Sequence, residues 1–99
     1  MITAIVLVNT TQGRTPEVAE ALLELSGVTE AYSVAGSYDL VVMVRVEHHE
    51  DLADVVAGRI QKTPGIEATN TLIAFQAYGR RQIEAGFAIG NEESLRQKP

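Results

Sequence analysis

The stretch AGSYDLVVMVRV, residues 35–46, decides the predicted fold. It opens with a turn at Gly36-Ser37 and continues as an apolar run rich in β-branched residues, which favour strands. The segment before it, residues 28–35, also contains β-branched and aromatic residues. Two such segments joined by a short glycine-containing turn are typical of a β-hairpin. The sequence therefore predicts strands at residues 28–35 and 38–46.

A strand and a helix are predicted before this hairpin. Residues 2–8 form an apolar run, interrupted only by Thr3, of the kind found in strands. Thr15 is a suitable N-cap, Pro16 is a suitable first helical residue, and Gly27 is a suitable helix end. Apolar residues at the spacing i, i+3, i+4 and i+7 form the predicted inner face of this helix: Val18, Ala21, Leu22 and Leu25.

A second helix and a last strand are predicted after the hairpin. The helix begins at His48 or His49 and ends at Thr63-Pro64-Gly65. The last strand covers residues 66–78. The order of elements is therefore β-α-β-β-α-β. This order indicates an α+β fold of the ferredoxin-like type, with a four-stranded antiparallel sheet and two helices on one face.

The second face of the predicted sheet is also apolar. In this fold the helices cover one face, and a face in water would alternate with polar residues. Each apolar side chain there would gain roughly 1.5–3 kcal/mol by leaving water, and such a patch is unusual on a monomer. We therefore predict a homodimer joined sheet on sheet, a dimeric α/β barrel; the alternative is that the tail folds back over the patch. The predicted patch contains Ile5, Leu7, Val41, Met43 and either Leu72 or Ile73.

Composition limits the classes of function. The chain has 99 residues, enough for one domain, and a net charge of −5, which argues against nucleic acid as a direct partner. The absence of cysteine removes thiolate metal sites and cysteine nucleophiles. No apolar run approaches the roughly 20 residues of a membrane helix, and the N-terminal run lacks the positive flank of a signal peptide. We expect a soluble cytoplasmic protein with no membrane partner.

Several motifs together resemble one known family. Over residues 2–78 the chain resembles the effector-binding domain of the Lrp/AsnC (feast/famine) transcription regulators, the RAM module. The resemblance implies a RAM-like ligand-binding domain at residues 1–79 and a C-terminal polar tail at residues 80–99. The motifs that carry it are Ala35-Gly36-Ser37-Tyr38-Asp39-Leu40, Leu52 in the second helix, Pro64-Gly65-Ile66 and Thr69-Asn70-Thr71.

The resemblance implies a regulatory module and not an enzyme. Members of the family bind small effectors, usually amino acids, in clefts between dimers that join through the sheet face and often assemble into octamers. They normally carry an N-terminal helix-turn-helix domain, whereas this chain starts at the first strand, so we expect a stand-alone module. Its output would then come through oligomer assembly or through a full-length Lrp/AsnC regulator as partner.

The candidate effector site combines the predicted turn with two strand residues. Gly36 is expected to adopt a positive φ, and the amides of this turn can bind a carboxylate. Asp39 has two open roles, because it can pair with the ammonium group of an amino acid or cap backbone amides. The ligand-binding residues implied are Gly36, Ser37, Tyr38, Asp39, Thr69 and Thr71.

The other site residues also have alternative roles. Tyr38 either lines the effector pocket or packs at the interface. Thr69 and Thr71 lie two apart and therefore point to the same face, either as effector ligands or as ordinary strand residues. Asn70 faces the other way. Arg45, in an otherwise apolar strand, either pairs with a carboxylate across the dimer or lies at an edge in water.

No cofactor, metal site or catalytic residue is predicted. The adjacent residues His48 and His49 indicate an exposed helix start, because neighbours in sequence seldom chelate one ion. Two other functions stay open as alternatives. One is a small dimeric ferredoxin-like enzyme of the monooxygenase type, which would need convergent titratable groups in a cavity. The other is an ACT-like regulatory domain, which has the same order of elements.

Overall fold

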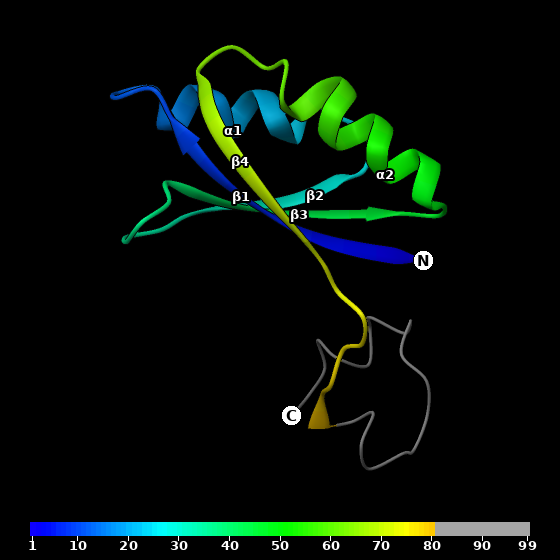
Figure 1. Cartoon of the computed structure of the whole chain (residues 1–99). Helices are drawn as coiled ribbons and strands as arrows, with labels where there is room; N and C mark the ends of the chain where they lie inside the picture. Colours follow the sequence, from blue (N-terminus) through cyan, green and yellow to red (C-terminus); the bar gives the residue numbers. More distant parts are fainter. Residues whose placement is uncertain (81–99) are drawn as a thin grey trace.

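The computed structural model describes residues 1–80 and confirms the predicted order of elements. All neighbouring strands are antiparallel and form one sheet in the order β2-β3-β1-β4 (Figure 1). The first and last strands in the sequence, β1 and β4, are therefore neighbours, and β1 is central. The strands are β1 (Ile2–Thr10), β2 (Val28–Ser33), β3 (Leu40–Val46) and β4 (Ile66–Ile73).

Both predicted helices lie on one face of this sheet, as Figure 1 shows. Helix α1 covers Thr15–Leu23. Helix α2 covers His49–Val55, with His48 at its N-cap, and continues as the π-helix η1 over Val56–Ile60. In residues 1–80 neither helix has the length and apolar character that crossing a bilayer requires.

The hydrophobic core lies between the sheet and the two helices. Alternate residues of β1 and β3 are buried because successive side chains of a strand point to opposite faces. The register aligns these buried positions, for example Val6 with Val42. The side chains with at most 1% exposure are Ala4, Val6, Val8, Val18, Leu22, Leu40, Val42, Val44 and Ile60.

The opposite face of the sheet carries the predicted apolar patch, which we call the open face. The register pairs Leu72 with Ile5 and Ile73 with Ala4, so Leu72 lies on the open face and Ile73 on the helix face. Leu72 is 48% exposed, and the remaining members are half-buried. The apolar residues of the open face are Ile5, Leu7, Val41, Met43 and Leu72.

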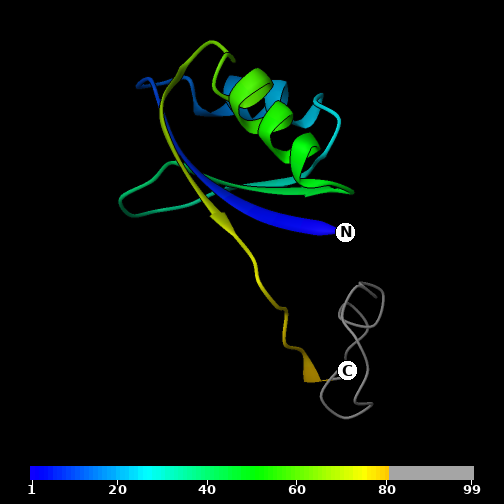
Figure 2. The same ribbon diagram turned by 45° about the vertical axis from the view of Figure 1, so that its right-hand side comes forward.

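The homodimer that this face suggests stays a prediction. Figure 2 shows residues 74–80 running away from the sheet, and nearly all of them are exposed. The alternative that the tail covers the open face concerns mainly residues 81–99, which lie outside the described part of the chain.

Four strand boundaries differ from the prediction. β1 continues to Thr10 and does not end at residue 8. β2 ends at Ser33 and β3 begins at Leu40, so the hairpin connection is the six-residue segment 34–39 rather than a two-residue turn. β4 ends at Ile73 and not at residue 78. The reason is its partner: the Ala74 N–H donates to the Thr3 carbonyl (2.9 Å), and β1 has almost no residues left to pair beyond that point.

The start and end of α1 also differ from the prediction. Thr15 is the first helical residue and not the N-cap, a position that Arg14 occupies without a side-chain cap bond. The Thr15 hydroxyl instead lies 2.8 Å from the hydroxyl of Thr10, at the end of β1. The helix ends at Leu23, before the positive-φ residue Gly27.

Candidate functional site

The connection between β2 and β3 is an ordered turn, residues 34–39. Its ends are held by two backbone hydrogen bonds: Val34 N–H donates to the Asp39 carbonyl (3.1 Å), and Asp39 N–H donates to the Val8 carbonyl (2.9 Å). Gly36 has φ +137°, which confirms the predicted positive φ. A Cβ at this position would meet no atom within 4 Å. Glycine is therefore required here for backbone conformation and not for space.

The turn leaves several backbone donors unused. Within residues 1–80, the N–H groups of Gly36, Ser37 and Tyr38 donate no hydrogen bond. Gly36 and Ser37 are exposed, and Tyr38 is half-buried. Successive N–H groups next to a positive-φ residue are a common means of holding an anion.

The carboxylate of Asp39 bonds to β1. Its Oδ2 accepts hydrogen bonds from Thr10 N–H (2.8 Å) and from the Thr10 hydroxyl (3.3 Å). Of the two open roles, bonding to a backbone amide is the one seen in this structure, although the amide belongs to β1 and not to the turn itself. The backbone pairing of β1 with β3 stops at Val8 and Leu40, so the carboxylate supplies an acceptor where the ladder has ended.

Tyr38 reaches across the central strand to β4. Its hydroxyl accepts a hydrogen bond of 3.4 Å from the side-chain amide of Asn70. Asn70 pairs with Leu7 in the sheet and therefore lies on the open face. The contact places the Tyr38 ring at the end of the open face that is nearest the turn.

Thr69 and Thr71 lie on the other side of β4. The register pairs them with Val8 and Val6, so they share one face, as predicted, and that face is the helix face. The Thr69 hydroxyl accepts a hydrogen bond of 3.1 Å from the side-chain amide of Gln61. A single subunit therefore brings Tyr38 together with Asn70, but it does not bring the two threonines onto the same surface as Tyr38.

Two contacts at this end of the sheet were not foreseen from the sequence. The role of Thr10 has a weak signal, because Asn9 and Thr10 are polar residues at the end of a mostly apolar strand. The orientation of Asn70 followed from alternation, but its contact with Tyr38 did not, since the two residues are 32 positions apart.

Arg45, near the opposite end of β3, lies away from the turn. On the open side of β3, Arg45 donates to the Thr29 hydroxyl (2.9 Å) and lies 3.9 Å from Glu30, so its partners include residues of its own subunit. Within residues 1–80, no group of three His, Cys, Asp or Glu side chains is arranged to hold a metal ion.

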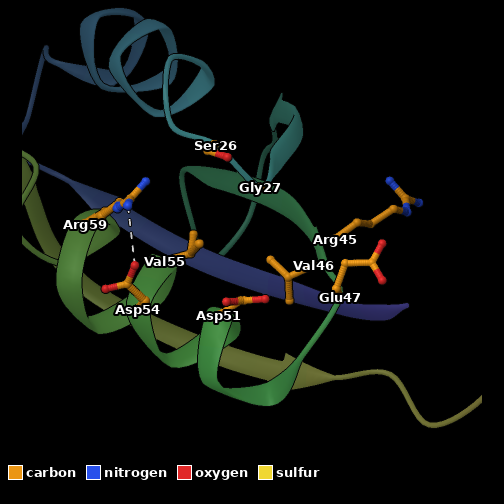
Figure 3. Close-up of a pocket in the computed structure, with 9 residues that line it drawn as sticks. All are labelled: Ser26, Gly27, Arg45, Val46, Glu47, Asp51, Asp54, Val55 and Arg59. Carbon is orange, nitrogen blue, oxygen red and sulfur yellow. Dashed lines mark ion pairs between the residues drawn. The ribbon is translucent and has the colours of Figure 1, made fainter.

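A shallow depression of about 380 Å³ lies beside α2 (Figure 3). It sits at the far end of β3 from the turn and includes none of the predicted site residues. An ion pair of 3.4 Å between Asp54 and Arg59 borders it. Its lining is Ser26, Gly27, Arg45, Val46, Glu47, Asp51, Asp54, Val55 and Arg59.

Comparison with known proteins assigns the fold to a family. Residues 3–83 match the model of the Lrp/AsnC ligand binding domain. The chain belongs to the Lrp/AsnC family. It is 33% identical to the HTH-type transcriptional regulator FL11 of Pyrococcus horikoshii over 75 aligned residues. The alignment covers 76% of this chain and 49% of FL11. The chain thus spans about half the length of this Lrp/AsnC relative.

Solved structures agree with this assignment. TTHA0845 from Thermus thermophilus has a TM-score of 0.76 and 49% sequence identity, covering 81% of this chain and 100% of that one. A feast or famine regulatory protein from M. tuberculosis, in complex with L-methionine, has a TM-score of 0.66 and 28% identity over 83% of this chain and 56% of that one. The named Lrp/AsnC relatives are transcriptional regulators and not enzymes, which argues against the monooxygenase-like alternative.

Proposed function

We propose that this Lrp/AsnC ligand-binding domain senses an amino acid, which binds at the turn 34–39 where copies of the chain meet. The observation that carries the proposal is the set of N–H groups at Gly36, Ser37 and Tyr38 that donate no hydrogen bond within residues 1–80. An amino-acid carboxylate bound there would gain charge-assisted hydrogen bonds. The L-methionine bound to the M. tuberculosis relative supports the same class of ligand.

The two segments of the candidate site come from different copies in this proposal. The Tyr38 side chain reaches the open face through its contact with Asn70, whereas Thr69 and Thr71 lie on the other side of the edge strand β4. A neighbouring copy that presents its β4 edge to the turn brings both segments to one ligand without distorting either sheet.

Homodimerisation through the open face is the first step of this assembly. Each of its apolar side chains gains about 25 cal/mol for every Å² of apolar surface that a partner removes from water. Four of the five are already half-buried in the single subunit, so each of those gains less than a fully exposed side chain would. Further assembly of dimers, up to an octamer, sets each turn beside another subunit. An amino acid that binds the assembled form more tightly than the separate form shifts the population toward assembly.

The output of the module passes through protein contacts and not through direct binding to nucleic acid. The net charge of −5 opposes contact with a phosphate backbone. A full-length Lrp/AsnC regulator is the proposed partner, and the cytoplasm is the proposed location. Co-purification of this chain with a full-length family member tests the partner, and a reproducible absence of mixed oligomers would count against it.

A thermal-shift screen of the twenty amino acids tests the sensing function. A ligand that binds only the folded protein stabilises it by about 2.7 kcal/mol at 100 times its Kd. For a domain of this size, each kcal/mol raises Tm by roughly 4–8 °C. We expect one amino acid, or a small related group, to raise Tm by about 10 °C or more. A flat response to all twenty would contradict the proposal.

A matched pair of variants locates the responding site. Gly13 and Gly36 both have positive φ and open space around a new Cβ, so an alanine strains the backbone at either position without a clash. Gly36→Ala should lower Tm and abolish the amino-acid response, because the turn N–H groups change direction. Gly13→Ala should lower Tm and keep the response. A full response in Gly36→Ala would place the ligand elsewhere.

A further inference from the structure

Asp39 links three segments of the chain. Its Oδ2 accepts two hydrogen bonds from Thr10 at the end of β1, and the Thr10 hydroxyl lies 2.8 Å from that of Thr15, the first residue of α1. We propose that Asp39 is a positioning residue of the effector site. It anchors the turn to β1 and α1 through Oδ2, and the response to the amino acid depends on this anchor and not on a charge contact with the ammonium group. This inference rests on the proposed function and refines it.

The backbone of Asp39 is held on both sides as well. Its N–H donates to the Val8 carbonyl (2.9 Å), and its carbonyl accepts from Val34 N–H (3.1 Å). Ser37 and Tyr38 directly precede this anchored residue. The directions of their unused N–H groups therefore depend on how Asp39 is fixed.

The Asp39 carboxylate accepts hydrogen bonds from the N–H and hydroxyl groups of Thr10. Breaking these bonds is unfavourable because Thr10 is buried. Thr10 is only 7% exposed, and a buried N–H without an acceptor is strongly unfavourable. A hydroxyl has one proton, so a Thr10 hydroxyl that donates to Asp39 must accept from the Thr15 hydroxyl. Turning Oδ2 toward an ammonium group would break this chain and strand the Thr10 N–H, so Oδ2 is kept for the anchor. Oδ1 takes no part in these bonds, and a contact there would leave the anchor unchanged.

The anchored corner also touches the start of β4. The N–H of Thr11, next to Thr10, donates to the Gly65 carbonyl at 2.7 Å, just before β4 begins. Gly65 in turn lies so close to α1 that an added Cβ would come within 2.7 Å of Val18 Cγ2. Asp39 thus fixes the turn to the same corner that holds the beginning of β4, the strand with both candidate threonines.

The first test measures the turn without any amino acid. Backbone hydrogen exchange of the hydrogen-bonded N–H groups of Thr10, Val34 and Asp39 is compared in wild type, Asp39→Asn and Asp39→Ala. The asparagine retains an acceptor oxygen for Thr10 N–H, whereas the alanine removes it. We expect exchange to rise about tenfold or more in Asp39→Ala and to stay within about threefold of wild type in Asp39→Asn. Equal exchange in all three proteins would overturn the proposal.

A third variant keeps this test decisive if Asp39→Ala does not fold. Thr10→Val removes the hydroxyl links to Asp39 and Thr15 and leaves the backbone bond in place. Exchange of the Val34 and Asp39 N–H groups should then rise by roughly two- to tenfold. The contradicting outcome is that no folded variant exchanges faster than wild type. If Thr10→Val, Asp39→Asn and a folded Asp39→Ala all exchange at the wild-type rate, the links do not hold the turn.

The second test titrates the same proteins with each of the twenty amino acids, using thermal shift. Asp39→Asn, which has lost the charge, should respond to the same amino acids as wild type with affinity lowered by less than about threefold. Thr10→Val should lose affinity by roughly two- to tenfold, although the buried Thr10 cannot touch the ligand.

The reverse pattern would overturn the inference. Loss of response in Asp39→Asn with normal exchange, and a full response in Thr10→Val, would mean that Asp39 pairs with the ammonium group directly. If wild type itself responds to no amino acid, the proposed function fails, whereas the exchange measurements still decide whether Asp39 anchors the turn.

Discussion

The two faces of the sheet have similar side chains and different surroundings. On the helix face, Val6 and Val42 are 0% exposed. On the open face, Ile5 and Met43 stay half-buried and Leu72 is 48% exposed. Strands that are apolar on both sides are typical of sheets covered on both faces. The helices account for half of the apolar pattern, and we propose that a second copy of the chain covers the other half.

The largest expected effect on stability comes from comparing a leucine of the core, Leu22, with a leucine of the open face, Leu72. Leu22→Ala should destabilise the protein by about 2–5 kcal/mol at any protein concentration, because Leu22 is fully buried in the subunit core. Leu72→Ala should cost less than about 1 kcal/mol in the dilute, dissociated protein and clearly more in the assembled protein. Urea unfolding at a low and a high protein concentration measures both values.

That contrast fails if Leu72→Ala has the same small cost at both concentrations. The open face would then be a solvated surface, and its apolar character would need another explanation.

The next effect adds a charge to the open face. Met43→Lys should prevent dimerisation because a partner would bury an unpaired ammonium group, at a cost of several kcal/mol. The Tm of wild type should rise with protein concentration, and that of Met43→Lys should not. Ala53→Lys adds the same charge to an exposed position of α2 and is the matched control. A concentration-dependent Tm in Met43→Lys would rule out the open face as the interface.

The smallest effect concerns the ion pair at the border of the open face. Arg45 lies 3.9 Å from Glu30, with side chains 25% and 48% exposed. Glu30→Gln should cost about 0.2–1 kcal/mol, and less in high salt if water reaches the pair. If a partner subunit covers the pair, the cost of Glu30→Gln should be the same in low and high salt. Unfolding of the assembled protein in low and high salt distinguishes a covered pair from a solvated one.

The fold was predictable because its signals are local. The apolar alternation of β1 and β3 and the glycine in the turn depend on neighbours in sequence, and both were interpreted correctly. The end of β4 at Ile73 was not predictable in this way, because it depends on where its partner strand stops.

The site was less predictable because its contacts are distant in sequence. The donors to Asp39 belong to Thr10, 29 positions away. No local sequence pattern at either residue indicates this contact. The π-helical turn of η1 was not predicted either, for a different reason. Its Gln61 N–H donates to the Val56 carbonyl, and the apolar spacing of α2 is equally compatible with an ordinary helix.

The mass of the wild-type protein in solution tests the central claim most directly. Light scattering during size exclusion, at micromolar concentration, should give twice the 10.7 kDa of one chain or a larger even multiple. An amino acid selected by the thermal-shift screen should shift the distribution toward the larger species. A particle of 10.7 kDa, unchanged by every amino acid, would contradict the account.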